Sequence, residues 1–417
     1  MLVEFRVSNF RSIREEQSLS LVANTDNEHS ETHLILNGSK STPSLLKSAV
    51  IYGANASGKS NIINALAFMK GVVAESATQI REGQKFYFQP FKLDGISSTK
   101  PSEFEITFIT DGIRYQYGFS LLAERIISEW LLVYKTSKPQ IWFDRRYNPE
   151  TNEDEYTFST FLAGEKKLWQ KSTRSNSLFL SKAVDLNSSA LRPVFLWIVQ
   201  QLKVIGAGEQ PMIEFSTLLA QKPEGNKQLL EFLNTADFSI SELSLEMRKT
   251  REVSLKIDGE KPPVHQVLDT EALMPVFLHK GAEGAAKFEI HDESTGTQRM
   301  FAFAGPILDV LHNGSVLIVD ELDGSLHTKI VRFLLNLINS STSNSKGAQL
   351  IFTTHDTSIM DVKILRRDQI WFVEKDQSHA THLYPLTDFR PRKNEALEKG
   401  YLAGRYGAIP FINDVMF

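Results

Sequence analysis

A buried strand that runs directly into a glycine-containing loop is the feature that most constrains the fold. Residues 48–53 read SAVIYG, an apolar run typical of a central strand covered on both faces. The run GANASGKS at 53–60 then matches G-x-x-x-x-G-K-[ST] in full, and apolar spacing predicts a helix from about Lys59 to Lys70. In this context the loop's N–H groups surround phosphates, Lys59 reaches the β and γ phosphates, and the Ser60 hydroxyl binds Mg²⁺.

Two later strands end in side chains that such a site needs. The run VLIVDE ends in Asp320, which can hold Mg²⁺ through water, and in Glu321, which stands where a general base for water has to be. The run AQLIFTTHD places His355 after the next strand, where a donor can stabilise a γ-phosphate. Alone, the acids fit a surface strand and the histidine a structural role. Together with the loop they indicate catalytic roles for Glu321, His355 and Lys59.

Apolar strands that alternate with predicted helices indicate a mainly parallel α/β sheet. Residues 86–184 have the alternation of an antiparallel β lobe, with a hairpin signal, DG, at 111–112. Residues 185–290 are predicted as a mostly helical insertion, from the apolar stripes in ALRPVFLWIVQQL and NKQLLEFL. The two halves of the α/β core are then 1–85, with the phosphate loop, and 291–417, with the acidic and histidine strands and a C-terminal tail.

Composition excludes several classes of protein. The 417 residues include no cysteine, which excludes disulfides, a thiolate nucleophile and a cysteine zinc site. The net charge of −4 does not indicate a nucleic-acid partner. Neither a signal segment nor an apolar run of about 20 residues is evident, so we expect a cytoplasmic protein without a membrane partner. Local basic clusters still permit nucleic acid; they are Lys166, Lys167, Lys171 and Arg174; Arg366 and Arg367; Arg390, Arg392 and Lys393.

The run HDESTGTQRM at 291–300 contains a Ser-x-Gly-x-Gln pattern just before an apolar segment. Ser294 is a good helix N-cap, and Gly296 lets another backbone come close. A helix that starts here presents free N–H groups and its positive dipole end to an anion. By itself the pattern fits a simple helix cap equally well.

The order of these motifs resembles that of the ABC-type ATPase head, in its SMC and RecF branch. The run VSNFRSI at 7–13 is similar to the Asn-Phe-Arg-Ser opening of that branch, and the loop is similar to its G-x-N-x-S-G-K-S form. The resemblance covers Val3 to about His355 and implies an α/β P-loop ATPase that uses ATP and Mg²⁺, with Ser60 and Asp320 at the metal. It implies nucleotide contacts from Arg11, Gly53, Asn55, Ser57, Gly58, Lys59, Ser60 and Asn61.

The same resemblance makes STGTQ a degenerate form of the signature motif. In the family this motif faces the ATP of the opposite protomer, so ATP joins two heads and hydrolysis separates them. Ser294, Gly296 and Gln298 would act in trans, and Asp323 in the run LDGSLH would lie in the loop that crosses the same interface. The implied assembly is a homo-oligomer, at least a dimer.

ABC-type heads also place a glutamine near Mg²⁺ and the attacking water. Gln89 has the right side chain but precedes most of the β lobe, whereas Ser181 has the better position in the chain but the wrong side chain. The sequence leaves the choice open.

Three further runs are similar to compact bacterial ATPases of the RloA and AbiL type: PFKLD at 90–94, LRRDQIWFVEKD at 365–376 and YLAGRYGAIP at 401–410. That group is associated with phage defence and is often encoded beside an effector. The resemblance implies a sensor or regulatory subunit that controls a separate effector protein, with a nuclease as one candidate. No nuclease motif is evident in this chain, so we expect any such activity on another polypeptide. The run GRYGAIP also fits a simple Gly/Pro turn or a docking element for a partner chain.

Two other functions are weighed against this one. A RecF-like DNA-binding ATPase of repair or recombination would close around duplex DNA, which the basic clusters permit and the net charge does not favour. A transporter's nucleotide-binding subunit needs no β lobe of this size. The missing heptad repeats exclude a long-armed SMC protein.

Overall fold

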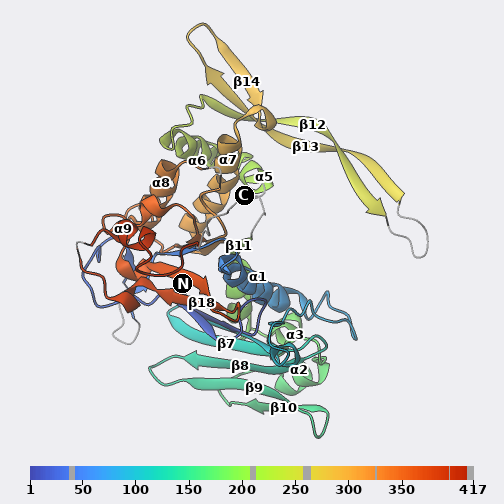
Figure 1. Cartoon of the computed structure of the whole chain (residues 1–417). Helices are drawn as coiled ribbons and strands as arrows, with labels where there is room; N and C mark the ends of the chain where they lie inside the picture. The colour runs from blue at the N-terminus through green and yellow to red at the C-terminus, as the bar shows by residue number, and fades with distance from the viewer. Residues whose placement is uncertain (37–42, 207–212, 257–263, 325, 394, 411–417) are drawn as a thin grey trace, which may run out of the picture. The chain divides into compact units, whose positions relative to one another are not determined.

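The computed structural model describes residues 1–36, 43–206, 213–256, 264–324, 326–393 and 395–410. The chain divides into two compact units, which are described separately below (Figure 1). The first unit contains Met1–Glu209, Val310–Gly324 and Val331–Phe417, and the second contains Gln210–Asp309 and Ser325–Ile330. The helices are α1 (Lys59–Glu75), α2 (Lys166–Ser172), α3 (Phe179–Asp185), α4 (Arg192–Leu196), α5 (Ile213–Ala220), α6 (Pro223–Thr235), α7 (Thr295–Asn313), α8 (Thr328–Asn339) and α9 (Leu397–Leu402).

The core of the first unit is a six-stranded, mainly parallel sheet, as predicted. The strands, in spatial order, are β11 (Leu202–Ile205), β15 (Val316–Val319), β16 (Gln349–Thr353), β5 (Ser48–Gly53), β17 (Ile370–Lys375) and β18 (Thr381–Pro385). All neighbours pair in parallel except β17 and β18. Every residue of β5, β15 and β16 is buried, which explains why these strands are apolar without alternation.

A seven-stranded antiparallel sheet forms the β lobe of the first unit (Figure 1). Its strands, in spatial order, are β10 (Glu153–Phe158), β9 (Gln140–Asn148), β8 (Ile126–Tyr134), β7 (Ile113–Leu121), β6 (Ser102–Thr110), β1 (Leu2–Ser8) and β2 (Gln17–Ser20). Asp111 and Gly112 have φ of 50° and 73°, so the predicted DG hairpin is confirmed. The boundary predicted at residue 85 is wrong for this sheet, because β1 pairs with β6 and belongs to the lobe. Two short strands, β3 (Leu34–Ile35) and β4 (Leu45–Leu46), pair separately.

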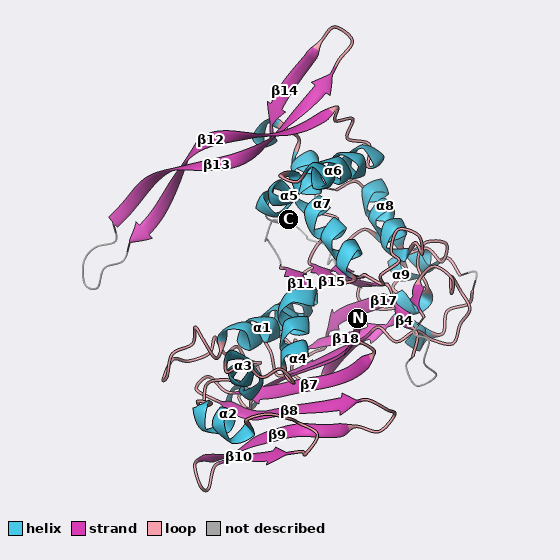
Figure 2. Cartoon of the chain, turned by 180° about the vertical axis from the view of Figure 1, so that it is seen from behind, coloured by secondary structure: helices cyan, strands magenta, loops and turns pink. Residues whose placement is uncertain are grey.

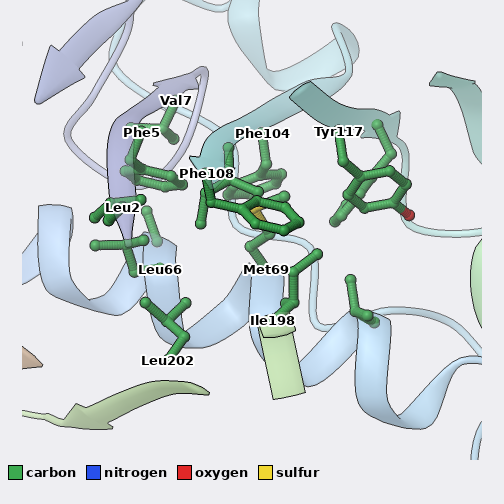
Figure 3. Close-up of a cluster of buried hydrophobic side chains, with 14 of the residues drawn as sticks. Leu2, Phe5, Val7, Leu66, Met69, Phe104, Phe108, Tyr117, Ile198 and Leu202 are labelled. Atoms are coloured by element: carbon green, nitrogen blue, oxygen red, sulfur yellow. The ribbon is translucent and has the colours of Figure 1, made fainter. Parts of the chain in front are cut away.

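The hydrophobic core of the first unit joins the lobe sheet to helix α1, as Figure 3 shows. Phe5, Phe104 and Phe108 point from the sheet toward Leu66 and Met69 of the helix, and all five side chains are almost fully buried. Truncating a buried Leu or Met to Ala typically costs about 2–5 kcal/mol. This packing holds the helix that begins at the phosphate loop.

Strands β8 and β9 of the lobe contribute a buried ion pair, and its carboxylate also binds the start of helix α3. The Glu129 carboxylate lies 3.6 Å from the Arg145 guanidinium, and both side chains are fully buried. Glu129 also accepts hydrogen bonds from the N–H groups of Phe179 and Leu180, at 2.6 and 2.9 Å, in the first turn of α3. Burial raises the pKa of Glu129, and the charge of Arg145 and these N–H donors oppose that effect. Breaking such a pair typically costs about 3–5 kcal/mol, and the two N–H donors to its carboxylate fix α3 against the lobe.

The mostly helical segment predicted for 185–290 is partly wrong. Helices α4, α5 and α6 lie there, but the second unit also contains an antiparallel sheet of β12 (Glu242–Lys256), β13 (Val264–Lys280) and β14 (Ala285–Glu289) (Figure 2). The signal was available: Leu243, Leu245 and Met247 alternate with polar residues, and such a period of two is typical of a strand. The helical stripes just before this segment masked it.

One of the basic clusters is used inside the first unit. The Arg366 side chain is almost fully buried, lies 2.7 Å from the Asp368 carboxylate and donates to the backbone carbonyls of Asp26 and Glu28. Arg367 pairs with the carboxylates of Asp26 and Glu28, at 2.5 and 3.1 Å. These two arginines hold the segment near residue 26 against the core, and their donors are engaged within the chain. Among the described residues, no helix is long and apolar enough to cross a membrane.

His33 lies buried beside this cluster. Its Nε2 atom is 3.0 Å from the backbone carbonyl of Ile364, and its ring lies 4.5 Å, between centroids, from that of His29. Burial lowers the pKa of His33 to about 4 because it disfavours the charged imidazolium; His29, Arg366 and Lys47 lower it further.

We therefore predict that His33→Gln flattens the dependence of stability on pH. The folded pKa of about 4 lies below the ordinary 6.5, so the stabilisation is complete above pH 6.5 and is lost as the pH falls toward 4. The free energy of unfolding, measured by denaturant titration, should fall by up to about 3 kcal/mol more in the wild type than in the variant between pH 7 and pH 4. Equal losses in the two proteins would contradict this prediction.

Candidate functional site

The phosphate loop follows β5 as predicted, and the close approach of two other strands explains its glycines. A Cβ atom on Gly53 would lie 2.4 Å from the backbone oxygen of Val373 in β17. A Cβ atom on Gly58 would lie 2.1 Å from the Thr381 hydroxyl in β18, and Gly58 has a φ of 113° at the N-cap of α1. Only glycine fits these positions without movement of the neighbouring backbone or side chain.

Lys59 folds back over this loop. Its ammonium donates to the backbone carbonyls of Gly53 and Ala54, at 2.7 and 3.1 Å. Burial lowers the pKa of Lys59, while the carboxylates of Asp320, Glu321 and, more weakly, Asp323 raise it. A phosphate oxygen bound at the loop would join or replace these carbonyls as an acceptor of hydrogen bonds from the Lys59 ammonium. Unlike the carbonyls, it would carry a negative charge.

Asp320 reaches the same edge of the sheet as the loop. The strands β15, β16 and β5 are parallel neighbours, so their carboxyl ends meet at one edge. The Asp320 side chain is buried, and its Oδ1 accepts a hydrogen bond of 2.5 Å from the Thr353 hydroxyl. Its Oδ2 is buried and has no hydrogen-bond partner among the described residues. A buried carboxylate oxygen left open beside a phosphate loop suits a hard cation such as Mg²⁺.

Thr353 links this acid to the next one. The backbone N–H of Glu321 donates to the Thr353 hydroxyl at 2.7 Å, while that hydroxyl donates to Asp320. Glu321 has a φ of 53°, a conformation that is strained for a residue other than glycine, and its side chain is exposed. The hydroxyl therefore fixes the peptide that aims Glu321. Thr353 stands in the run TTHD, but only the strand pairing reveals this contact.

His355 lies beside Asp323 in the first unit. The Asp323 carboxylate accepts a hydrogen bond of 3.2 Å from the backbone N–H of His355, whose side chain is exposed. The other oxygen of Asp323 is buried without a partner among the described residues. The strand order thus brings together Lys59, Asp320, Glu321, Asp323 and His355 at the carboxyl ends of three adjacent strands.

Comparison with known protein families agrees with the phosphate-binding geometry of this site. A family model described as "AAA domain, putative AbiEii toxin, Type IV TA system" matches residues 48–361, more than half of the 417-residue chain. The chain belongs to this family of AAA-domain ATPases. The match begins at β5 and includes the phosphate loop, the two acids and the histidine. With the parallel core sheet, it confirms the predicted α/β P-loop ATPase fold.

Comparisons with solved structures and with curated protein sequences give less information about this chain. A crystal structure of an SMC head, SmcHead, bound to the C-winged helix domain of ScpA covers 92% of this chain and 96% of its own chain, with 15% identity and a TM-score of 0.44. No curated protein sequence matches this chain significantly.

The opening of this AAA-family chain lies outside the matched range but contacts the loop helix. The Arg11 guanidinium donates to the side chains of Gln89, at 2.7 Å, and Asn61, at 3.5 Å. Arg11 has a φ of 51°, and its backbone N–H donates to the Gln89 carbonyl at 2.7 Å. The structure thus brings Arg11, Asn61 and Gln89 together at the first turn of α1.

Ser181 occupies a different place. Its side chain is buried, and its hydroxyl donates to the Val73 carbonyl of α1 at 2.6 Å. Val73 lies 14 residues beyond Lys59 on this helix, which is roughly 20 Å at 1.5 Å per residue. The hydroxyl of Ser181 therefore serves packing, and of the two candidates only Gln89 lies among the predicted nucleotide-binding residues.

The remaining loop residues differ in exposure. Asn55 is exposed at the tip of the loop, whereas Ser60 is half-buried in the first turn of α1. The Ser57 side chain is buried, and its hydroxyl has no hydrogen-bond partner among the described residues.

The Ser-x-Gly-x-Gln pattern lies in the second unit and begins helix α7. The Ser294 hydroxyl accepts a hydrogen bond of 3.1 Å from the Thr297 N–H, which confirms the predicted N-cap. The Gln298 side chain donates to the Glu293 carbonyl at 2.8 Å, and Gly296 is half-buried. Within one chain this pattern is therefore a helix cap with an exposed serine, and a role in trans stays a prediction.

The C-terminal run YLAGRYGAIP folds against its own core. Tyr406 is fully buried, and its hydroxyl donates to Glu395 at 2.6 Å. The N–H of Ala408 donates to the carboxylate of Glu374 in β17 at 3.0 Å, and the Tyr401 hydroxyl donates to the Ala408 carbonyl. These bonds dock the described part of the run within the chain.

We predict that Thr353→Val slows ATP turnover much more than it weakens ATP binding. The valine cannot donate to Asp320 or accept from Glu321, so both acids lose their support while every group of the phosphate loop stays. We expect kcat to fall about 10- to 100-fold, with a change in Kd for ATP below about threefold. Thr353→Ser keeps the hydroxyl and is the matched control. Wild-type kcat in Thr353→Val would contradict the role assigned to this hydroxyl.

Proposed function

We propose that this protein binds ATP with Mg²⁺ and hydrolyses it at the site on β5, β15 and β16. The observation that carries the proposal is the open, buried oxygen of Asp320 at the sheet edge that also carries the phosphate loop. A phosphate loop alone supports nucleotide binding, whereas a metal ligand and an exposed acid, Glu321, beside it support hydrolysis.

Each residue has one role in this proposal. The loop N–H groups from Gly53 to Asn61, with Lys59, bind the phosphates, and Ser60 and Asp320 would hold Mg²⁺, which neutralises phosphate charge. Glu321 acts as general base for the attacking water, and His355 donates to the γ-phosphate. Gln89 takes the part of the water-orienting glutamine, and Arg11 contacts nucleotide from the first turn of α1.

The second part of the proposal is that ATP joins two copies of the chain. The N-terminus of α7 offers N–H groups and a positive dipole end, and Ser294 is exposed there. Ser294, Gly296 and Gln298 of one copy, with Asp323, would then complete the site of the other. The described residues of one chain leave the serine facing solvent, as such a shared site requires.

The third part concerns the biological role. The description of the matched family includes a Type IV toxin–antitoxin system, and the sequence resembles ATPases of phage defence. No nuclease motif is evident in the chain, and the GRYGAIP run is engaged by its own core. We propose a sensor or regulatory subunit of an abortive-infection type system, which controls a separate effector protein.

The pairing is tested by light scattering on Glu321→Gln, which should bind ATP and hydrolyse it poorly. With ATP and Mg²⁺ its mass should rise from that of one 47.1 kDa chain to about twice this value. Adding Ser294→Arg should abolish the rise but leave ATP binding in the first unit intact. Because arginine also removes a helix cap, Ser294→Asp is the matched control: it keeps the cap, opposes the γ-phosphate by charge, and should abolish the rise as well. An unchanged mass of ATP-bound Glu321→Gln would refute the pairing.

The regulatory role is tested in cells that carry the chain with its neighbouring gene. Protection from phage, measured as plaque number, should disappear when the neighbouring gene is deleted and equally when Lys59 is replaced by alanine. Full protection by the chain alone would overturn the proposal of a separate effector, whereas full protection by Lys59→Ala would overturn the need for ATP.

A further inference from the structure

The C-terminal hairpin of β17 and β18 lies beyond residues 48–361 but forms part of the phosphate loop's surroundings. A side chain at Gly53 would first meet the Val373 carbonyl of this hairpin, and a side chain at Gly58 would first meet its Thr381 hydroxyl. Asp376 stabilises the hairpin turn, because its carboxylate accepts from the N–H groups of Ser378 and Ala380, at 2.8 and 2.9 Å. The position of Thr381 beside the loop is thus set by a well-bonded turn.

Thr381 is almost fully buried and is bonded on three sides. Its hydroxyl lies 3.0 Å from the Ser57 carbonyl and 2.7 Å from the Ser12 hydroxyl, and its backbone N–H donates to the Ser12 carbonyl at 2.7 Å. The Asn61 amide in turn donates to the Ser12 hydroxyl at 2.6 Å. These contacts join the N-terminal opening, the loop, the loop helix and the C-terminal hairpin.

The direction of these hydrogen bonds follows from chemistry. A carbonyl only accepts, so the single hydroxyl proton of Thr381 goes to Ser57. Ser12 must then donate to Thr381, and it accepts from Asn61. The chain of donors therefore runs from Asn61 through Ser12 and Thr381 to the Ser57 carbonyl, with every hydroxyl satisfied.

The end of this chain controls a phosphate-binding group. In a trans peptide the C=O and N–H bonds point in opposite directions, and the Ser57 carbonyl shares its peptide plane with the Gly58 N–H. Because the carbonyl points at Thr381, the Gly58 N–H points away from it, to the other side of the loop. Fixing the carbonyl therefore fixes the direction of a backbone donor of the G-x-x-x-x-G-K-S loop.

We propose that Thr381 is a positioning residue that, with Ser12, holds the Ser57–Gly58 peptide of the loop in its phosphate-binding orientation. The inference rests on the proposed binding of ATP by this loop. It assigns part of that site to a C-terminal hairpin that the family match does not include. Thr381 acts through the loop and not by touching nucleotide.

The test compares Thr381→Val, Thr381→Ser and Ser12→Ala in the full chain. Valine has nearly the shape of threonine, but it removes the donor to Ser57 and the acceptor for Ser12. We expect Kd for both ATP and ADP, measured by calorimetry, to rise roughly tenfold in Thr381→Val. The melting temperature without nucleotide should change by less than about 3 °C. Thr381→Ser should bind like the wild type, and Ser12→Ala should lie between the two.

Amide hydrogen exchange without nucleotide gives a readout that does not depend on ATP. Exchange in residues 54–62 should accelerate in Thr381→Val and return to the wild-type rate in Thr381→Ser, while exchange in α8 stays unchanged. If the wild type fails to bind ATP, the proposed function is wrong, and the exchange result still decides whether Thr381 orders the loop. The inference is overturned if loop exchange and affinity are unchanged in Thr381→Val, or if only the melting temperature falls.

Discussion

Parallel pairing in the core sheet, of β5 with β16 and β17 and of β16 with β15, determines where the phosphate loop, the two acids and His355 lie. Because parallel strands end at the same edge, the loop after β5 meets the acids after β15 and the histidine after β16. The same pairing brings β17 so close that only glycine fits at residue 53. The helix after the loop is held by the aromatic core of the β lobe. The loop is thus supported by strand β5 before it, by helix α1 after it, and by the contacts of β17 and β18 with its two glycines.

Hydroxyl groups support the charged residues of this site. Thr353 bonds the two acids across neighbouring strands, and Thr381 with Ser12 bonds the loop to the two ends of the chain. Each hydroxyl donates one bond and accepts another, so it can fix two groups at once. In a buried setting such paired bonds are costly to break, since each partner would be left unsatisfied. The chemistry proposed for the acids and the lysine depends on these small neutral residues.

The sequence located the groups proposed to perform chemistry better than the groups that position them. The loop, the acids, the histidine strand and the DG hairpin have short local patterns, and the structure places each of them as expected. The pairing of Thr381 with Ser12 spans 369 positions and has no local pattern, so it could not be predicted. The ribbon of β12 and β13 had a local signal in Leu243 and Met247, but the neighbouring helical stripes outweighed it. The membership of strand β1 in the lobe depends on a pairing with β6 that periodicity does not encode.

The position of β5 also has a consequence for synthesis of the chain. Both of its neighbours come late: β16 begins at Gln349 and β17 at Ile370, each about 300 residues after β5 in the chain. At the usual 5–20 residues per second, this strand, fully buried in the finished sheet, waits roughly 15 to 60 seconds for its partners. During translation it is a natural target for chaperones that bind exposed apolar segments. The strands β17 and β18, which contact the loop at Gly53 and Gly58, are synthesised late, so a nascent or truncated chain carries the phosphate motif without these neighbours.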